Sequence, residues 1–594
     1  MQILWCDDLT RLCPRTGRAL ADEETGGRAA PVSLRSARHA FASFQLLAGP
    51  LRPTDAVCVR PGALVGPRGA RIGSSAFDVY VAWYATIDGT AYPEALVPQE
   101  LIGGSTPEFR KLNGVTGQRY AGFWIDLHVP ADAVPGRYAG RVTVRADREE
   151  HVLPLAVEVS RATLGTSCCL DVSLNNYADN ISNGWPALAD KPGHLRSPLY
   201  RRVERGAFCA AHDHRMFLHY LPYGHSGHVA PTFAPPLAGE GCGRHVSDWS
   251  DWDRHFGGYF DGQAFAGTRR GAVPVKRFYL PLNLCWPSDF LKFGLPGYEA
   301  EWRAVGRDMA AHFRARGWTG TRFDMFPNHK QRFHFFPWDT EEVRFLEDND
   351  LHRYLGTIWR GTFDRVTTAP VTFDYTLGTT WTYHLDIRSD LASFIDLYIA
   401  GTAGPAWFPG DLPRLHRRGR QVWSCTNSGA IPASLRAPAF VPLLMWMRDL
   451  DGYMPAWCSM GNWHGDPWRE PAGDGGITFL YPGAPFGSEE TFVSLRLKVQ
   501  RNMLQTVDLL DLASRRLPGG RRAVQRQVDR ALGMTRAAWF IKPPAYIERK
   551  LPRDWVNADY ATEEPPLADW KRLPVDRFRE VAGLALDLAA GGRS

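Results

Sequence analysis

Eight short apolar runs between residues 170 and 458 constrain the fold of this 594-residue chain more than any other feature. The runs are LDVSLN (170–175), MFLHYLPY (216–223), RFYLPLNL (277–284), TRFDMFP (321–327), VTFDYT (371–376), DLYIAG (396–401), QVWSCTN (421–427) and GYMPAWC (452–458). Nearly continuous apolar runs are typical of strands that are buried on both faces of a parallel sheet. Longer segments with helical periodicity, such as YEAEWRAVGRDMAAHFRARG, separate them. The pattern predicts a (β/α)8 barrel of the TIM type.

The segments before and after these runs have different patterns. From about residue 75 to 160, apolar and polar residues alternate between Pro and Gly turns, as in FDVYVAWYATI, which predicts an antiparallel β-sandwich. A helix-like segment, SLRLKVQRNMLQTVDLLDLASRR, follows the last run and would close the barrel. We therefore expect a multidomain chain: an N-terminal β-sandwich over 1–162, a catalytic (β/α)8 barrel over 163–516, and a C-terminal helical and irregular extension over 517–594.

Composition and charge exclude several kinds of partner. The hydrophobic fraction of 44% and the charged fraction of 22% are those of a folded globular protein. The net charge of +6 is spread along the chain, which argues against a nucleic-acid surface. No apolar run is long enough to span a membrane, and the N-terminus lacks the pattern of a signal peptide. We expect a cytoplasmic protein with no nucleic-acid or membrane partner; the sequence does not define its oligomeric state.

Motifs for cofactors and metals are missing from the sequence. The ten cysteines form no CxxC pair, and there is no P-loop, complete GxSxG elbow or dinucleotide fingerprint. His212 and His214 have a spacing that can chelate a metal, but they precede the second run and would lie at the wrong end of the barrel. We expect no cofactor and no metal.

Polar residues at the carboxyl ends of the eight runs are candidates for a site, because the active site of such a barrel lies there. Asn, Lys and Trp side chains at these positions suit a polyhydroxylated ligand, which they can bond at its edges and stack against. The candidates are Asn175, Asn176, Asn283, Asn328, Lys330, Asp374 and Trp457. Each asparagine could instead cap a strand-to-helix turn.

The segment PWDTEE, at residues 337–342, follows the fourth run in a loop rich in aromatic residues. Burial and mutual repulsion separate the pKa values of adjacent carboxyls, so Glu341 and Glu342 could serve as an acid and a charged partner. Trp338 could stack on a sugar ring. The alternative is the solvated first turn of a helix, where acidic residues are favoured by the helix dipole.

Several fragments together resemble glycoside hydrolase family 123 and a related barrel domain of unknown function. They are FWIDLHVPADAVPGRYAGRVTV, LDVSLNNY, AHDHRMFLHYLPY, WDRHFGGYFDGQAF, FYLPLNLCWP, MFPNHK with PWDTEEV, and GDGGITFLYPG with SLRLKVQRNMLQTVDLL. The resemblance spans most of the chain. It implies a β-sandwich before a (β/α)8 barrel, and retaining hydrolysis of β-linked N-acetylgalactosamine by substrate assistance.

The resemblance also implies roles for the two glutamates. Glu342 matches the acid that protonates the leaving oxygen, and Glu341 matches the residue that holds the attacking 2-acetamido group. The sequence departs from the family pattern twice, with Glu341 where Asp is expected and Val343 where Pro is expected. The longer side chain moves the carboxylate on the order of 1 Å, a displacement that can slow an oriented reaction substantially.

Three functions remain open at this stage. The first is a glycosidase, exo- or endo-acting on a carbohydrate substrate, with Glu342 as acid and Glu341 as partner. Its expected substrate-binding residues are Asn175, Asn176, Asn283, Asn328, Lys330, Trp338, Asp386 and Trp457. The second is a glycosidase on another sugar, in which Glu342 faces Asp386, Asp374 or Asp339 across roughly 5 to 9 Å. The third is a carbohydrate-binding barrel without catalysis, which the two departures motivate.

Overall fold

The computed structural model describes most of the chain. The described residues are 1–20, 26–29, 31–102, 108–112, 114–147, 149–189, 194–221, 233–327, 338, 340, 346–379, 390–426, 429–456, 459–460, 466–471, 478–542 and 573–591. The side chains of 177–179, 194, 220–221, 346–347, 379, 390 and 403 are not described.

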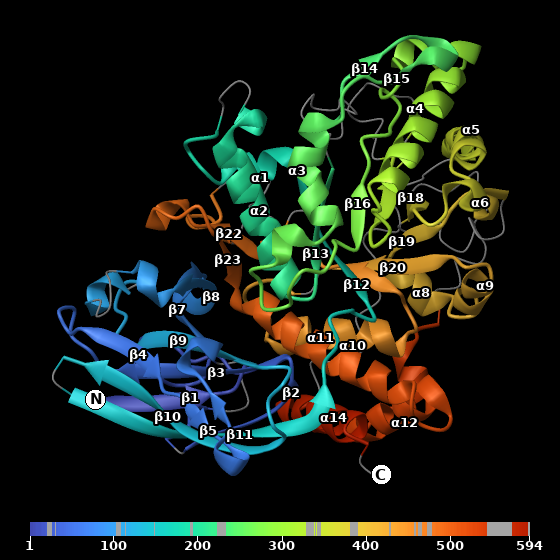
Figure 1. Ribbon diagram of the computed structural model, residues 1–594. Helices are drawn as coiled ribbons and strands as arrows, with labels where there is room; N and C mark the ends of the chain where they lie inside the picture. Colours follow the sequence, from blue (N-terminus) through green and yellow to red (C-terminus); the bar gives the residue numbers. More distant parts are fainter. Residues whose placement is uncertain are drawn as a thin grey trace.

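Eight parallel strands form the central sheet, in the order β13-β12-β21-β20-β19-β18-β17-β16 (Figure 1). Their bounds are β12 (Asp171–Tyr177), β13 (Phe217–Leu221), β16 (Arg277–Tyr279), β17 (Arg322–Met325), β18 (Thr372–Thr379), β19 (Leu397–Gly401), β20 (Gln421–Cys425) and β21 (Gly452–Met454). The two outer strands face each other, since the ring of His219 on β13 stacks on Tyr279 of β16 with centroids 3.2 Å apart. The sheet is thus a nearly closed barrel. Each predicted run overlaps one strand, so the predicted barrel is confirmed.

Helices follow and cover the strands. They are α1 (Ala178–Asn183), α2 (Pro198–Asp213), α3 (Ser250–Phe260), α4 (Pro296–Ala315), α5 (Leu346–Thr362), α6 (Arg365–Thr368), α8 (Ala403–Trp407), α9 (Leu412–Arg417), α10 (Arg436–Met447), α11 (Leu495–Ser514), α12 (Gly520–Leu532) and α14 (Val575–Ala589). Local signals start several of them: Ser197 accepts a hydrogen bond from the Tyr200 N–H at the start of α2, and Ser494 does the same for Leu497 in α11. A two-stranded ribbon, β14 (Leu237–Ala238) with β15 (His245–Val246), lies between α2 and α3 in sequence.

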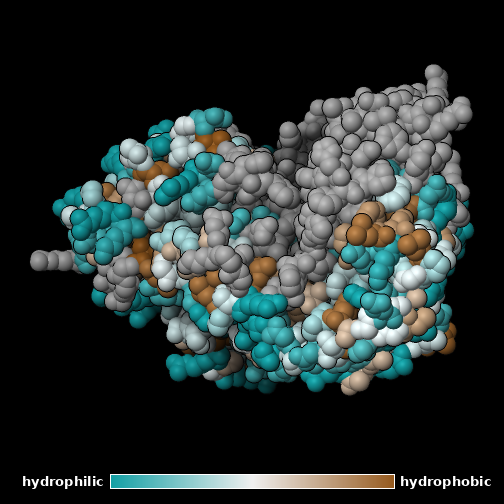
Figure 2. All heavy atoms as spheres, turned by 90° about the horizontal axis from the view of Figure 1, so that it is seen from above, coloured by the Kyte–Doolittle hydropathy of each residue, from teal (hydrophilic) through white to brown (hydrophobic). Residues whose placement is uncertain are grey.

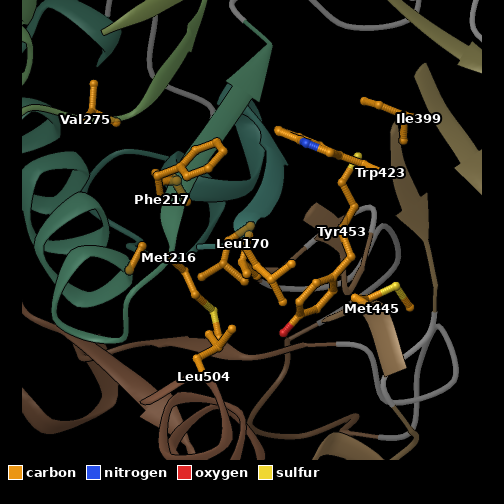
Figure 3. Packing of buried hydrophobic residues seen from close by; sticks show 14 of the residues in the cluster. Leu170, Met216, Phe217, Val275, Ile399, Trp423, Met445, Tyr453 and Leu504 are labelled. Atoms are coloured by element: carbon orange, nitrogen blue, oxygen red, sulfur yellow. The ribbon is translucent and has the colours of Figure 1, made fainter. Parts of the chain in front are cut away.

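Helices α10 and α11 pack against the barrel. All twelve residues of α10 are buried, and a helix that is apolar all round is typical of a core position. Figure 3 shows Leu170, Met216 and Leu504 gathered where the amino ends of the strands meet α11. The hydroxyl of Tyr453 on β21 donates to Oε1 of Gln500 on α11 at 2.9 Å. The strands and α11 therefore form one continuous core.

Two mainly antiparallel sheets precede the barrel and share a second hydrophobic core. The seven-stranded sheet has the order β1 (Gln2–Cys6), β3 (Ala40–Gly49), β9 (Ala121–Val129), β7 (Phe77–Ile87), β8 (Thr90–Pro98), β23 (Thr491–Ser494), β22 (Leu480–Pro482). The six-stranded sheet contains β2 (Val32–Arg38), β11 (Glu149–Thr163), β10 (Gly136–Ala146), β5 (Leu64–Val65) and β6 (Arg71–Ile72), with β4 (Val57–Pro61) paired to β10. Strands β22 and β23 follow the barrel in sequence, so the chain returns to complete the first sheet.

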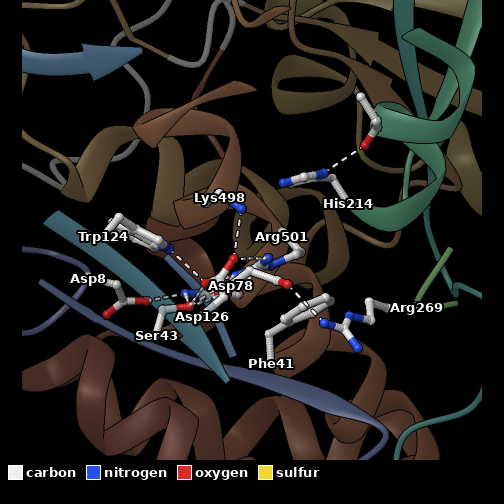
Figure 4. A network of polar contacts seen from close by, with 12 residues as sticks. Asp8, Phe41, Ser43, Asp78, Trp124, Asp126, His214, Arg269, Lys498 and Arg501 are labelled. Carbon is white, nitrogen blue, oxygen red and sulfur yellow. Dashed lines mark hydrogen bonds and ion pairs between the residues drawn. The ribbon is translucent and has the colours of Figure 1, made fainter. Parts of the chain in front are cut away.

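A buried ion cluster joins the seven-stranded sheet to α11 (Figure 4). Asp126, on β9, has no exposed surface and binds Lys498 Nζ at 2.7 Å and Arg501 Nη2 at 2.8 Å. Trp124 Nε1 and Ser43 Oγ each donate to the same carboxylate at 2.7 Å. Burial alone would raise the pKa of Asp126, but the charges of Arg501 and Lys498 hold it well below its usual range.

The helices after α11 pack against it. α14, which corresponds to the predicted helical stretch near the C-terminus, contacts α11, α12 and the strands β2 and β11. Its buried residues include Val575, Phe578, Val581 and Ala585, which recur at helical spacing along one face. The C-terminal helix is therefore part of the barrel core and also contacts the six-stranded sheet.

The described surface is mixed in polarity. On the face seen in Figure 2, hydrophobic residues form small groups separated by hydrophilic ones. Within the described ranges, no helix combines the length and apolar character that crossing a membrane requires.

Replacing Asp126 with Asn should lower the free energy of unfolding by about 3 kcal/mol, because Lys498 and Arg501 would stay buried without a counter-charge. The pKa of Asp126 is lowered in the folded state, so its contribution is complete above about pH 4 and is lost as the pH falls through the folded value. Melting temperatures measured from about pH 5 to pH 8 should show a constant deficit for the variant. Glu489→Gln, which breaks the exposed pair with Arg202, is the control and should change little. Equal melting temperatures for the two variants would contradict this account.

Candidate functional site

Asn175 and Asn176 stand at the carboxyl end of β12, as the sequence predicted, and both are fully buried. They hold the short segment 459–460: the Ser459 N–H donates to the Asn175 carbonyl at 3.0 Å, and the Met460 N–H donates to Asn176 Oδ1 at 2.9 Å. The side-chain nitrogen of Asn176 has no hydrogen-bond partner in the described part of the chain. One donor is thus left over at this strand end.

Asn283 follows β16 and is also fully buried. Its Oδ1 accepts hydrogen bonds from the backbone N–H groups of Cys285 at 2.6 Å and Trp286 at 3.1 Å. This is the turn-capping geometry that the sequence left as the alternative for each asparagine. The Nδ2 atom of Asn283 has no acceptor among the described residues. Capping therefore uses the oxygen of the side-chain amide but not its nitrogen.

Thr340, one of the two described residues between 328 and 345, has hydrogen bonds on both sides. Its hydroxyl donates to the carbonyl of Pro327 at 3.1 Å, and its own carbonyl lies 3.1 Å from Nε2 of His352. Both Thr340 and His352 have no exposed surface. The backbone immediately before Glu341 is therefore attached to both the end of β17 and the helix α5.

His352 has a defined tautomer in this arrangement. Burial lowers its pKa to about 4, so the imidazole is neutral at pH 7. With Nε2 donating to Thr340, Nδ1 must accept, and the hydroxyl of Tyr375 on β18 lies 2.9 Å from it. Tyr375, His352 and Thr340 thus form a chain of hydrogen bonds from the barrel wall to this segment.

Trp338 is half-buried and packs against Phe293, with ring centroids 5.3 Å apart. Most of the indole is thus used in packing against the core, and a smaller part is exposed.

A charged cluster fills the barrel interior towards the amino ends of the strands. Arg277, at the start of β16, bonds Asp324 at 2.6 Å, Asp374 at 3.1 Å and Asp171 at 3.2 Å. Burial raises the pKa of Asp324 to about 7 despite the neighbouring Arg277. Its free Oδ2 lies 3.6 Å from Nε2 of His219, whose pKa is held well below the usual value by burial.

Asp374, one of the sequence candidates, belongs to this cluster. Both of its oxygens bind Arg322, at 2.6 and 2.8 Å, and Arg277 contacts one of them. The carboxylate is fully buried. Burial would raise its pKa, but Arg277 and Arg322 lower it, so the group is ionised and fully paired.

The remaining predicted residues cannot be compared with this geometry. Glu341, Glu342, Asn328, Lys330, Asp386 and Trp457 lie outside the described residues, as does Asp339. The structure adds His352, Tyr375, His219 and Asp324, which the sequence analysis missed. No spacing rule links His352 to Thr340, because the contact depends on how the intervening loop folds.

The histidine pair near the end of α2 has backbone partners. His212 Nε2 lies 3.0 Å from the Gly271 carbonyl, and His214 Nδ1 lies 2.6 Å from the Ala210 carbonyl. Within the described ranges, no three His, Cys, Asp or Glu side chains are arranged to hold a metal ion.

Comparison with solved structures finds a likeness over the full length of the chain. No protein-family model and no curated protein sequence matches the chain. The fold is similar to that of a family 123 glycoside hydrolase from Clostridium perfringens, with a TM-score of 0.62, 11% identity, and coverage of 99% of this chain and 98% of that chain. At this identity the likeness concerns the fold alone.

Two further solved structures are much less similar. A putative alpha-galactosidase from Bacteroides fragilis has a TM-score of 0.26 and 11% identity, covering 81% of this chain and 77% of that one. A beta-glucuronidase from Parabacteroides merdae has a TM-score of 0.22 and 9% identity, covering 76% and 48%. Likenesses this weak carry no argument.

His352→Gln should reduce the loss of stability at acidic pH. The folded pKa of about 4 lies below the ordinary histidine value of 6.5, so in wild type the unfolded state binds the extra proton between these values. Wild type should therefore lose up to about 3 kcal/mol through this residue as the pH falls from about 6.5 to 4, whereas the glutamine has no proton to gain. Melting temperatures across this range measure the difference.

Tyr375→Phe is the matched control for this prediction. It removes the hydroxyl that bonds His352 but leaves the imidazole, so it should cost about 1 kcal/mol at every pH. If the His352→Gln and wild-type pH profiles have the same slope, His352 is not buried in its neutral form.

Proposed function

We propose that this chain is a glycoside hydrolase that acts on a glycan or glycoconjugate. The observation that carries the proposal is the full-length likeness to the Clostridium perfringens enzyme, whose structural analysis concerned glycolipid glycan hydrolysis. The proposal includes the finer architecture expected from the sequence: a β-sandwich over 1–162, a catalytic barrel over 163–516 and a C-terminal extension over 517–594.

The proposed reaction is retaining hydrolysis of a 2-acetamido-β-hexoside, of N-acetylgalactosamine type. The acetamide carbonyl oxygen attacks the anomeric carbon while the bond to the leaving oxygen breaks, and Glu342 gives its proton to that oxygen. Glu341 accepts a hydrogen bond from the acetamide N–H and stabilises the positive charge of the cyclic intermediate. Water then attacks the anomeric carbon, loses its proton to Glu342, and reopens the ring with net retention.

The bonds of Thr340 support this assignment of roles. A peptide bond joins Thr340 to Glu341, and Thr340 is attached to Pro327 and His352. A fixed attachment point just before the acidic pair would limit its motion, and orientation of reacting groups contributes strongly to rate. Glu341 has one more methylene than the expected aspartate, so a fixed starting point matters more here.

The proposed ligand contacts extend to the neighbouring strand ends. The free Nδ2 atoms of Asn176 and Asn283 are buried donors without acceptors in the described part, and leaving such a donor unpaired is costly. A sugar hydroxyl that reached either would satisfy it, and the free part of Trp338 could stack on a ring. Asn175 is included for its position beside Asn176. Asn328, Lys330, Asp386 and Trp457 remain proposed contacts on the basis of the sequence.

In the alternative mechanism, a second carboxyl faces Glu342, and Asp374 is no longer a candidate for it. Asp374 has both oxygens paired with arginines and no exposed surface, so it is unsuited to attack a sugar. A second carboxyl would have to come from Asp386 or Asp339. The two mechanisms differ in whether the substrate must carry an acetamide.

Glu342→Gln should lower kcat/KM on substrates with poor leaving groups by about a thousandfold, and on activated aryl glycosides by much less. A good leaving group needs little protonation in the transition state. Steady-state kinetics on a matched pair of substrates measures the contrast. Glu490→Gln changes an exposed glutamate and should match wild type on both. An equal loss on both substrates in Glu342→Gln would show that Glu342 is not the acid.

Of two matched aryl glycosides, the one with a 2-acetamido group should be hydrolysed at least about a hundredfold faster than the one with a 2-hydroxy group. Only the 2-acetamido substrate carries its own nucleophile. A thiazoline analogue of the cyclic intermediate should inhibit strongly, as transition-state mimics do. Equal rates without thiazoline inhibition would favour two facing carboxyls. Binding of glycans without any hydrolysis would favour the non-catalytic carbohydrate-binding barrel.

A further inference from the structure

A hollow of about 1010 Å³ lies at the amino end of the barrel. Its walls come from α9, from the residues that lead into β21, and from α12. Because the amino and carboxyl ends of parallel strands are opposite ends of a barrel, this hollow is remote from the proposed sugar site. Helices α9 and α12 lie near each other on one side of the barrel in Figure 1.

The lining has a strong excess of positive charge. It contains six arginines and three aspartates, besides His416. The arginines are Arg417, Arg448, Arg521, Arg522, Arg526 and Arg536, and the aspartates are Asp449, Asp451 and Asp529. Three positive charges are therefore left without an acidic residue in the hollow.

The three aspartates already have partners. Asp449 is shared by Arg521 at 3.3 Å, Arg522 at 3.0 Å and Arg536 at 3.1 Å.

The other two carboxylates are also engaged. Asp451 lies 3.0 Å from His416 Nε2 and accepts a hydrogen bond from the Val422 N–H, while Asp529 accepts from the indole of Trp539 at 2.6 Å. None of the three is left for the remaining guanidinium groups.

Arg448 is the buried member of the excess. It is 1% exposed, and its Nε donates to the Trp539 carbonyl at 2.7 Å. Its Nη2 has no hydrogen-bond partner among the described residues, and no described carboxylate forms an ion pair with it. Burial lowers the pKa of Arg448 to about 10, so it stays charged at pH 7. A buried charge without a counter-ion is unfavourable unless a ligand supplies one.

Two exposed arginines complete the unpaired set. Arg417 is the last residue of α9 and Arg526 lies on α12, and neither forms an ion pair with a described residue. One buried and two exposed guanidinium groups thus line the same hollow without counter-charges.

We propose that this hollow binds a phosphate-rich anion of the diphosphate class. The planar fork of a guanidinium group matches two oxygens of a phosphate, and the fork of Arg448 has an unused nitrogen. A diphosphate carries several oxygens and more than one negative charge. It could therefore bind more than one of Arg448, Arg417 and Arg526 at the same time. This inference does not depend on the proposed hydrolase function, because the two sites share no residue.

Calorimetric titration of the full chain with inorganic pyrophosphate tests the proposal, at a chloride concentration of about 150 mM that screens non-specific attraction. We expect saturable binding at one site, about tenfold tighter than that of orthophosphate or sulfate, which are shorter. Arg448→Met should weaken pyrophosphate binding at least tenfold. The double variant Arg417→Gln with Arg526→Gln should weaken it to a similar extent, and its exposed positions spare the fold.

The matched control is the double variant Arg137→Gln with Arg141→Gln, which removes the same charge from exposed positions on β10. It should bind pyrophosphate like wild type. Equal affinities for the two double variants would overturn the proposal, as would weak binding of all three anions that declines in step with added chloride.

Discussion

The burial of one carboxylate, Asp126, is the interaction on which the arrangement of the molecule depends. Lys498 and Arg501 approach it from α11, and a second pair from the same helix, Arg496 with Glu94 of β8, lies at 2.6 Å and is equally buried. The opposite side of α11 packs against the barrel strands. Buried ion pairs add little net stability, but they tolerate only one geometry. The helix therefore fixes the orientation of the sheets relative to the barrel.

Buried ion pairs also occupy the interior of the barrel. Arg277 is surrounded by three aspartates, and Arg322 and Lys276 bring the charges into balance. A buried cluster of three basic and three acidic side chains occupies the space towards the amino ends of the strands, where a ligand could otherwise enter. The proposed site is thereby confined to the carboxyl ends, where the Nδ2 atoms of Asn176 and Asn283 have no acceptor among the described residues.

The sequence could predict the barrel, because continuous apolar runs and helical periodicity are local properties that survive in the eight strands and in α4, α11 and α14. It could not predict pairings set by register. Asp374 lies in an apolar run, where it was a candidate for ligand binding, yet its carboxylate is paired with Arg322 and Arg277. His352 bonds Thr340, twelve residues earlier, and β22 and β23 join a sheet whose other strands lie several hundred residues earlier. Long-range contacts of this kind have no local signal.

The two ends of the barrel also differ in the dipoles of their helices. Helices that follow the strands point their amino termini towards the carboxyl end of the barrel and their carboxyl termini towards the other end. The partial negative charge of a helix carboxyl terminus favours nearby cations. Arg417 is the last residue of α9 and Arg448 is the C-cap of α10, so each lies in such a field. The field falls off within one turn and amounts to about half a charge, which explains how unpaired guanidinium groups can persist there and why a fully charged anion would still bind them.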